Sequence, residues 1–216
     1  MDRLSKAAIR IPGLEIRVVE RCGSTNAVLL TEAPDRPVLL AAETQTAGRG
    51  RRGRKWRSAP GAGATFSILR RMRCTPAALV GLPIAVGAAA ARALRALGAR
   101  GVTLKWPNDL MARRRKLGGI LIETRSAATA GAAQTLVVVG VGINCRRQPR
   151  LRARLGRGVA ALEELLRRPV ARNAVIGAVG RGVLAALADW ERAQFENTAG
   201  NAAGAAPDRR LSARAA

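Results

Sequence analysis

Arginine and glycine are concentrated in one short stretch of the chain, Gly48-Arg49-Gly50-Arg51-Arg52-Gly53-Arg54-Lys55-Trp56. Glycine lets backbone N–H groups approach a ligand closely, and arginine offers a planar fork of donors that matches phosphate and carboxylate. An arginine-rich run is most often a solvated loop, but the glycine spacing favours an anion site. We therefore predict a loop that closes over an anion. Because it holds no internal apolar anchor, we expect it to be disordered without ligand.

Two common nucleotide-binding motifs fail on this stretch. Gly48, Gly50 and Gly53 match G-x-G-x-x-G, but that fingerprint requires a buried strand before it and a helix that opens within it. The flanking segments 44–47 and 54–61 provide neither. A P-loop requires Lys and then Ser or Thr after its last glycine, and Arg54-Lys55 does not comply. The chain is therefore predicted to be neither a Rossmann protein nor a P-loop NTPase.

Two further segments combine polar residues with turn signals. Lys105-Trp106-Pro107-Asn108-Asp109 ends a short strand at a proline and an Asn-Asp pair, which by itself is a common turn. Lys116-Leu117-Gly118-Gly119-Ile120-Leu121 follows a polar hairpin tip, and glycines inside a strand indicate that something approaches the backbone closely. The Lys116 ammonium could then point at a ligand that lies over Gly118 and Gly119.

The elements that must position these segments follow from hydrophobic periodicity. We predict strands over residues 14–19, 37–43, 64–69, 102–105 and 136–144, so that the basic loop lies between two strands. Ser24-Thr25-Asn26 predicts a helix start, for which simple capping is the alternative reading. Further helices are predicted over 76–97, 151–166 and 173–195. Residues 197–216 lack periodicity and predict a disordered Ala/Gly/Arg tail after a domain of residues 1–196.

Composition limits the classes of function. The net charge of the 216-residue chain is +24, which suggests nucleic acid as a partner, although an arginine-biased genome produces the same mix. The chain has no histidine and three widely spaced cysteines, which argues against histidine catalysis, a metal site and a disulfide scaffold. No signal peptide is visible, and the longest apolar run, at 79–91, is too short to span a bilayer. We expect a cytoplasmic protein without a membrane partner.

Five blocks in this order resemble the biotin–protein ligases (biotin–[acetyl-CoA-carboxylase] ligases). The blocks are Ser24-Thr25-Asn26, Gln45 through Trp56, Lys105 through Asp109, Lys116 through Leu121, and Gly140-Val141-Gly142-Ile143-Asn144. The resemblance covers roughly residues 18–144. It implies an α/β (α+β) domain like that of class II aminoacyl-tRNA synthetases, with a mixed β-sheet flanked by helices. It also implies ATP, Mg²⁺ and biotin, and a carrier lysine that is biotinylated through biotinyl-5′-AMP.

The resemblance assigns roles residue by residue. Arg51 and Lys116 would neutralise charge on phosphorus during adenylation, and Asp109 would accept the proton of the attacking lysine, which is protonated at pH 7. Biotin and its adenylate would contact Ser24, Thr25, Asn26, Gln45, Arg49, Gly50, Arg51, Lys116 and Gly119. The nucleotide would contact Trp56, Asn108 and Asn144. Trp56 would stack on adenine or seal the loop, unless it merely packs.

The chain also departs from the family pattern. The residues before Ser24 are too few for the N-terminal DNA-binding domain of some members, since domains start near about 50 residues. We therefore expect an enzyme-only form without specific DNA binding. The C-terminal SH3-like domain of the family is expected to be absent, and Thr65 stands where a tyrosine is common. The implied partner is a biotin carboxyl carrier protein, and a homodimer is compatible with the sequence. Alternatives are a lipoate or octanoate ligase of the same fold, or a basic nucleic-acid-binding module.

Overall fold

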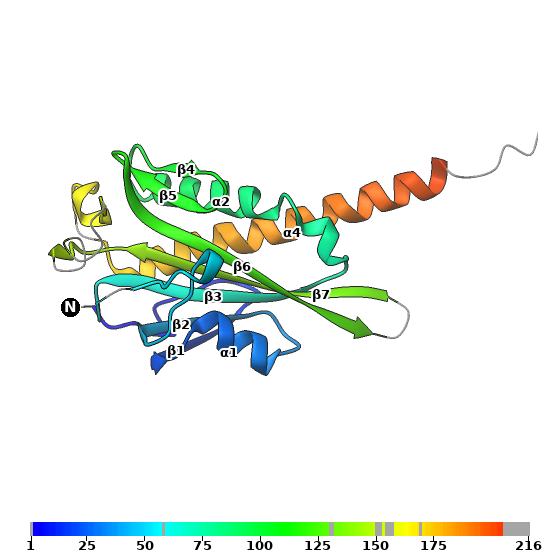
Figure 1. The fold of residues 1–216 in the computed structure, drawn as a ribbon, viewed down its shortest axis with the longest axis horizontal. Coiled ribbons are helices and arrows are strands. Elements are labelled where there is room, and N and C mark those ends of the chain that lie inside the picture. Colours follow the sequence, from blue (N-terminus) through cyan, green and yellow to red (C-terminus); the bar gives the residue numbers. More distant parts are fainter. Residues whose placement is uncertain are drawn as a thin grey trace, which may run out of the picture.

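The fold is built on a seven-stranded mixed sheet, whose strand order is β1-β2-β3-β7-β6-β5-β4 (Figure 1). The computed structural model describes residues 2–57, 59–129, 132–149, 153, 158–168 and 170–204. Only β1 and β2 are parallel, and every other neighbouring pair is antiparallel. The strands are β1 (Glu15–Cys22), β2 (Val38–Gln45), β3 (Gly63–Met72), β4 (Thr103–Lys105), β5 (Asp109–Ala112), β6 (Arg115–Thr129) and β7 (Ala132–Asn144).

Helices cover the two faces of the sheet unequally. The long helices α2 (Leu82–Ala96) and α4 (Arg172–Gly204) pack together on one face, and the short helix α1 (Thr25–Glu32) lies on the other (Figure 1). The main apolar core lies between the sheet and the helix pair, and a smaller cluster around Leu29 lies under α1. The predicted mixed sheet flanked by helices is therefore confirmed, as are the strands expected on both sides of the basic loop.

The helix predicted over 76–97 is divided in two. Pro76–Leu79 forms a 3₁₀ turn, and α2 begins only at Leu82. Pro83 explains the interruption, because its ring occupies the space of the carbonyl four residues earlier and it has no N–H to donate. The predicted end near Gly98 is confirmed, since α2 ends at Ala96 and Gly98 has a φ of +97°.

The helix predicted over 151–166 is confirmed at Ala153 and is wrong over the described residues 158–166. Residues 158–161 are extended, and Leu162–Glu164 forms only a short 3₁₀ turn. The extended segment pairs with the start of β6: Lys116 N–H donates to Gly158 O at 3.0 Å, and Ala160 N–H donates to Lys116 O at 2.9 Å. The backbone of this segment thus finds hydrogen-bond partners on β6 instead of within a helix. Most of residues 151–157 lie outside the described part of the chain.

The prediction of a disordered tail over 197–216 is also corrected in part. Helix α4 continues to Gly204, past the predicted end at Phe195 and into the proposed tail. The reason is intrinsic propensity: the alanines in 197–204 favour a helix that has already begun, since extension fixes one residue per added hydrogen bond. Residues 205–216 lie outside the described part of the chain.

One described stretch, Pro76–Ala96, has the length and apolar character of a membrane span, with 44% of it buried. The core helix of a soluble protein passes the same test, and α2 within this stretch packs on the sheet and on α4. The stretch is therefore weak support for a membrane span.

A buried arginine, which the sequence did not reveal, joins the chain's N-terminal segment to the sheet. The Arg172 side chain is 1% exposed and donates to Glu43 at 2.7 Å and to Asp2 at 3.2 Å. Burial by itself would raise the pKa of the Glu43 carboxyl, but the hydrogen bonds from Arg172 and from Leu4 N–H outweigh it, so the pKa lies below its ordinary value. This cluster holds the end of β2, from which the chain enters the basic loop.

Candidate functional site

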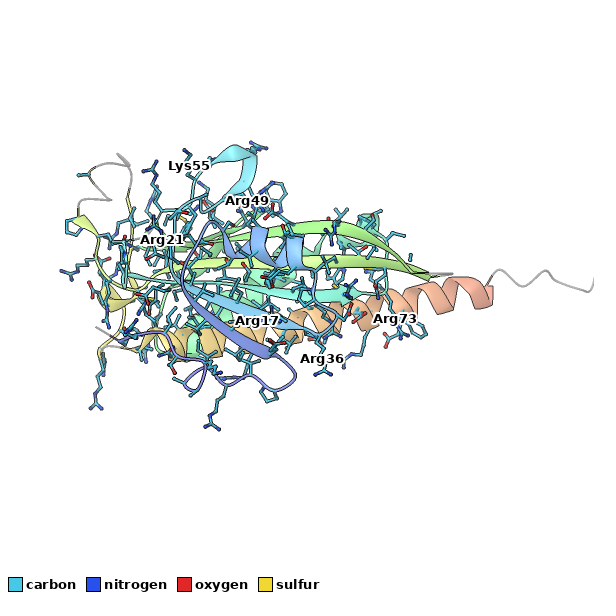
Figure 2. All side chains as sticks on the ribbon, turned by 90° about the horizontal axis from the view of Figure 1, so that it is seen from below. Arg17, Arg21, Arg36, Arg49, Lys55 and Arg73 are labelled. Atoms are coloured by element: carbon cyan, nitrogen blue, oxygen red, sulfur yellow. The ribbon has the colours of Figure 1, made fainter. Side chains whose placement is uncertain are left out.

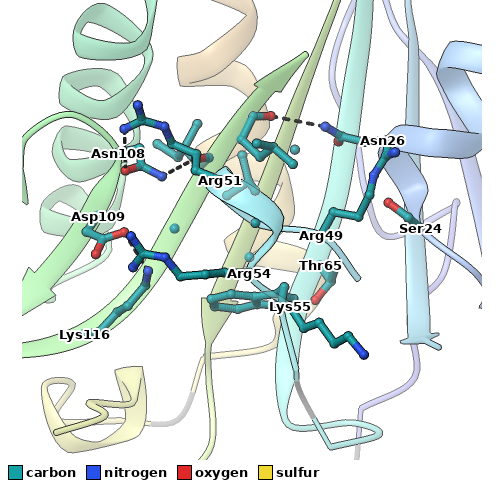
Figure 3. A pocket seen from close by; sticks show the side chains of 18 of the residues that line it. Ser24, Asn26, Arg49, Arg51, Arg54, Lys55, Thr65, Asn108, Asp109 and Lys116 are labelled. Atoms are coloured by element: carbon teal, nitrogen blue, oxygen red, sulfur yellow. Dashed lines mark hydrogen bonds and ion pairs between the residues drawn. The ribbon is translucent and has the colours of Figure 1, made fainter. Parts of the chain in front are cut away.

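A cavity of about 370 Å³ lies at the point where the predicted blocks converge (Figure 3). This volume falls within the ordinary range for small-molecule sites, about 300–1,000 Å³. The cavity is lined by the predicted residues Ser24, Thr25, Asn26, Gln45, Arg49, Gly50, Arg51, Trp56, Asn108, Asp109, Lys116 and Gly119. The structure thus brings together four of the five sequence blocks, and two glycines of the fifth, Gly140 and Gly142, also line the cavity.

The basic loop has a defined conformation, contrary to the expected disorder. Arg49 and Lys55 form an antiparallel bridge, Gly50 N–H donates to Arg54 O at 2.7 Å, and Trp56 N–H donates to Gly48 O at 2.8 Å. The tip, Arg51–Gly53, is a 3₁₀ turn. The loop is therefore a small hairpin held together by hydrogen bonds between its own main-chain groups.

Trp56 anchors this hairpin to the sheet. A Cβ built on Gly142 would lie 2.3 Å from Trp56 Cε2, so the indole rests directly on the β7 backbone. The indole Nε1 is buried and is without a hydrogen-bond partner among the described residues. Of the uses considered for Trp56, sealing the loop fits this contact. The sequence did not reveal the anchor, because its receptor is a bare glycine backbone on another strand.

Thr25, Gln45 and Ser67 form a hydrogen-bonded floor. Gln45 Oε1 accepts from Thr25 N–H at 2.7 Å and from Thr25 Oγ1 at 3.0 Å, and Thr25 Oγ1 lies 2.6 Å from Ser67 Oγ. These contacts fix the Gln45 amide so that its oxygen is occupied, whereas its Nε2 has no partner among the described residues. Gln45 can therefore donate to a ligand carbonyl, and its predicted contact with biotin stays a prediction.

Asn26 is already saturated by the protein. Its Oδ1 accepts from Ser67 Oγ at 2.5 Å, and its Nδ2 donates to Leu121 O at 3.2 Å and to Glu123 at 2.8 Å. Gly140 makes this fit possible, since a Cβ there would lie 2.3 Å from Asn26 Oδ1. Asn26 therefore shapes the cavity wall, and its predicted bond to a ligand stays a prediction.

Ser24 has two roles in the structure. It is the N-cap of α1, and its Oγ accepts from Ala27 N–H at 3.5 Å, which is a long contact. It also lines the cavity. The sequence left open whether Ser24 only caps a helix or also belongs to a binding site. In the structure Ser24 both caps α1 and lines the cavity.

Glu123 connects the basic loop to this floor, and the sequence did not single it out. Its carboxylate pairs with Arg49 at 3.0 Å and also accepts from Asn26. Arg49 is thus held beside the cavity by a carboxylate from β6. The available signal was its position, because Glu123 is a charged residue directly after the apolar residues 120–122 of β6.

Arg51 reaches across to the turn that precedes β5. Its Nη1 donates to Asn108 Oδ1 at 3.3 Å, and Asn108 Nδ2 donates in turn to Ile120 O at 2.9 Å. Ile120 N–H also bonds to Asn108 O at 2.9 Å. Because Asn108 is fixed on β6 by two bonds, it positions the Arg51 guanidinium over the cavity (Figure 3).

Lys116 and Asp109 form the central ion pair of the cavity. Lys116 Nζ lies 2.6 Å from Asp109 Oδ1, and their side chains are 19% and 26% exposed. Gly119 faces both, since a Cβ there would lie 3.5 Å from Lys116 Nζ and 3.8 Å from Asp109 Oδ1. In Figure 3 the Arg54 side chain also extends toward this pair, whereas Lys55 extends away from it. The glycine thus leaves open space beside a carboxylate and its cation.

Asn144 is not among the residues that line this cavity. Its side chain is buried, and its Nδ2 donates to Lys116 O at 3.4 Å while its Oδ1 accepts from Gln148 at 3.4 Å. Asn144 therefore supports the Lys116 main chain in this structure. Its predicted contact with a nucleotide stays a prediction.

Several lining residues were not predicted as site residues. They are Arg52, Arg54, Lys55, Thr65, Phe66, Lys105, Trp106, Pro107, Ile120, Leu121, Gly140, Val141 and Gly142. Most of them belong to the blocks that the sequence singled out, so their position in the chain was the available signal. The loop residues also line a second, wider hollow of about 1260 Å³, together with Arg146, Arg147, Gln148 and Pro149.

Metal-binding groups are scarce in this site. Among the described residues, no group of three or more His, Cys, Asp or Glu side chains could hold a metal ion. Asp109 is the one carboxylate among the residues that line the cavity. A divalent cation here would therefore depend on ligand oxygens in addition to Asp109, which is how Mg²⁺ is commonly bound beside phosphates.

Positive charge is spread over the molecule. Figure 2 shows Arg49 and Lys55 at the basic loop, Arg17 and Arg36 near β1, and Arg73 toward the opposite end of the sheet. A nucleic-acid-binding module concentrates its cations on one face or stripe. The distribution of these cations therefore does not favour the basic module that the net charge suggested.

Comparison with known proteins gives a consistent result. Residues 18–144 match the model of the biotin/lipoate A/B protein ligase family. The chain is 44% identical to the bifunctional ligase/repressor BirA of Escherichia coli over 137 residues, which are 62% of this chain and 42% of that protein. It is 41% identical over 143 residues to the biotin–[acetyl-CoA-carboxylase] ligase of Mycobacterium tuberculosis, covering 62% and 51% of the two chains. The chain thus spans about half the length of these relatives.

Solved structures show the same architecture. The biotin protein ligase from Aquifex aeolicus in complex with biotin and ATP superposes with a TM-score of 0.66 at 28% identity, covering 88% of this chain and 77% of that one. The biotin protein ligase from Leishmania major in complex with biotinyl-5-AMP gives a TM-score of 0.66 at 24% identity, covering 88% and 80%. The second similarity supports the fold alone.

Proposed function

The chain belongs to the biotin/lipoate A/B protein ligase family, and we propose that it ligates biotin to a lysine of a biotin carboxyl carrier protein at the expense of ATP. One observation carries the proposal. The Arg51–Asn108 contact joins segments far apart in the chain, and together with the Lys116–Asp109 pair it lines one cavity that Gly119 leaves open. The relative from Mycobacterium tuberculosis, which is named as a biotin–[acetyl-CoA-carboxylase] ligase, supports biotin as the substrate.

In the first step the biotin carboxylate oxygen attacks the α-phosphorus of ATP, and pyrophosphate leaves. Two anions repel as they approach, so the step requires fixed cations that neutralise the developing charge. Arg51 and Lys116 supply that charge, and Arg49 and Arg54 also line the cavity. Asp109 would offer one oxygen ligand to a Mg²⁺ ion bound to the phosphates, and the ion would neutralise phosphate charge.

The biotin ring would lie on the floor of the cavity. Gln45 offers its free Nε2 to the ureido carbonyl, and the other floor contacts keep the amide oriented for that bond. Preorganised donors cost less entropy on binding than mobile ones. Gly119, which leaves room beside Lys116, would let the carboxylate end of biotin reach the cations.

In the second step a carrier lysine attacks the carbonyl carbon of biotinyl-5′-AMP, an amide forms and AMP leaves. The lysine begins as an ammonium at neutral pH, so one proton must pass to a base. Asp109, held at 2.6 Å from Lys116 Nζ, is the carboxylate of the cavity that can accept it. The basic hairpin, anchored through Trp56, would shield the anhydride from water.

The test is biotin-dependent exchange of labelled pyrophosphate into ATP with the purified chain. Exchange with biotin and none with lipoate or octanoate would support the proposal over the other branch of the family. Exchange with lipoate but not biotin would reassign the substrate. Absence of exchange with all three acids, under conditions where the protein is folded, would refute adenylation by this chain.

A further inference from the structure

Trp106 is a large aromatic residue left open to solvent at the cavity rim. It is 73% exposed and lies in the turn between β4 and β5. The other large apolar residues exposed in the described part of the chain are Val80, Ile84 and Phe195, and none of these lines the cavity. Exposed tryptophan at a functional opening is typical of contact surfaces, where tryptophan is enriched among the residues that dominate binding.

The Trp106 backbone is held rigidly on both sides. Before it, Leu104 packs so closely on α2 that a Cβ on Gly87 would lie 2.7 Å from a Leu104 methyl group. After it, Asn108 makes two bonds to Ile120, and Leu110 is fully buried. The exposure of the indole therefore does not result from a loosely held turn. A rigid aromatic loses little conformational entropy when a partner covers it.

Two exposed cations line the same cavity as this indole. Lys105 and Arg52 are exposed, line the cavity opening and pair with no carboxylate among the described residues. A surface with an aromatic centre and unpaired cations around it fits a partner with an apolar side chain and acidic neighbours.

The reaction itself directs the acceptor chain to this rim. The acceptor lysine must reach the vicinity of Asp109, and Trp106 lies three residues before Asp109, which is the first residue of β5. Consecutive Cα atoms lie about 3.8 Å apart, so residues next to the acceptor lysine must pass over the rim. We propose that Trp106 docks the carrier protein, by packing on an apolar side chain next to the acceptor lysine. This inference rests on the proposed function.

Kinetics of Trp106→Ala separate docking from the first step. We expect the KM for a purified carrier domain of acetyl-CoA carboxylase to rise about tenfold or more, while biotin-dependent pyrophosphate exchange changes less than about twofold. Trp106→Phe should recover part of the loss. Phe195→Ala is the matched control, because Phe195 is also 73% exposed but does not line the cavity. This variant should change neither the KM for the carrier domain nor the rate of pyrophosphate exchange. An equal loss of exchange and transfer would assign the indole to the adenylate instead and overturn the proposal.

A contact measurement tests the proposal without turnover. Hydroxyl-radical footprinting with mass spectrometry would compare Trp106 and Phe195 with and without an excess of the same carrier domain in its unbiotinylated form. We expect protection of Trp106 and none of Phe195. Unprotected Trp106 in a mixture where the carrier domain is shown to bind, or an unchanged KM in Trp106→Ala, would refute the docking role. Absence of biotin-dependent pyrophosphate exchange in the unmodified protein would instead refute the proposed function. Failure of the docking role and failure of the proposed function are therefore distinguishable.

Discussion

Lys116 Nζ lies 2.6 Å from Asp109 Oδ1, and the two side chains come from the neighbouring strands β6 and β5. The pair is less than one-third exposed at each end, so its charges are screened less than those of a surface pair. The pair therefore holds together the Lys116 ammonium, proposed to neutralise phosphate charge, and the Asp109 carboxylate, proposed to accept a proton.

Lys116→Ala should lower the rate of biotin-dependent pyrophosphate exchange about 100-fold or more, because loss of a charged donor to the transition state costs about 3–4 kcal/mol. Lys116→Arg should retain part of the rate. Arg36→Ala, an exposed arginine outside the cavity, is the control and should keep the exchange rate. Normal exchange in Lys116→Ala would remove this lysine from the mechanism.

Arg51→Ala should shorten the lifetime of enzyme-bound biotinyl-5′-AMP as well as slow its formation. The substitution removes both a cation over the cavity and the 3.3 Å bond that joins the hairpin to Asn108, so water reaches the anhydride more readily. The lifetime is measured by gel filtration of the complex followed by quantification of retained adenylate. A lifetime equal to that of the unmodified protein would contradict this role of the hairpin.

Gly142→Ala should displace the Trp56 indole, because the new Cβ would lie 2.3 Å from the ring. We expect a red-shifted tryptophan emission and a loss of exchange activity of about tenfold or more, since a misplaced loop misaligns the cations. Gly177→Ala, within α4, meets only the end of the flexible Arg181 side chain at 3.4 Å. This control should leave activity intact and preserve or slightly raise stability, and similar behaviour of both variants would show that the indole contact is dispensable.

Acid should destabilise the chain through Glu43. Because its folded pKa is lowered below the unfolded value, its contribution is complete above the ordinary glutamate pKa of about 4.3 and is lost as pH falls through the lower folded pKa. Glu43→Gln should therefore lower the free energy of unfolding at pH 7 by about 3 kcal/mol, as for a broken buried pair, and the difference should shrink toward pH 3. Urea titrations at both pH values measure it.

Glu20→Gln provides the comparison for that experiment. Glu20 pairs with Arg3 at 2.9 Å, but the two side chains are 77% and 79% exposed. Exposed pairs contribute little to stability, so its urea midpoint should match that of the unmodified protein. A pH-independent effect of Glu43→Gln would mean that the Arg172 cluster does not carry the acid sensitivity.

Local patterns were sufficient for most of the sheet and for the composition of the site. Alternating and β-branched runs predicted β1, β2, β3 and β7, because a strand's side-chain period is written directly in its residues. The glycines of β6 and β7 indicated a close approach to the backbone, and the structure shows what approaches: Asn26 at Gly140 and Trp56 at Gly142. The order of the five blocks, more than any one of them, indicated the family.

The residues alone thus specified most of the strands and the candidate groups of the site, since periodicity, turn residues and charge are local properties. Tertiary structure decided the rest. It anchored the basic hairpin through Trp56 and engaged the Asn26 amide in hydrogen bonds within the protein. It also buried Arg172 against Glu43 and paired the extended residues 158–161 with Lys116. Each of these outcomes depends on a contact between segments distant in the chain, whose energy no local pattern contains.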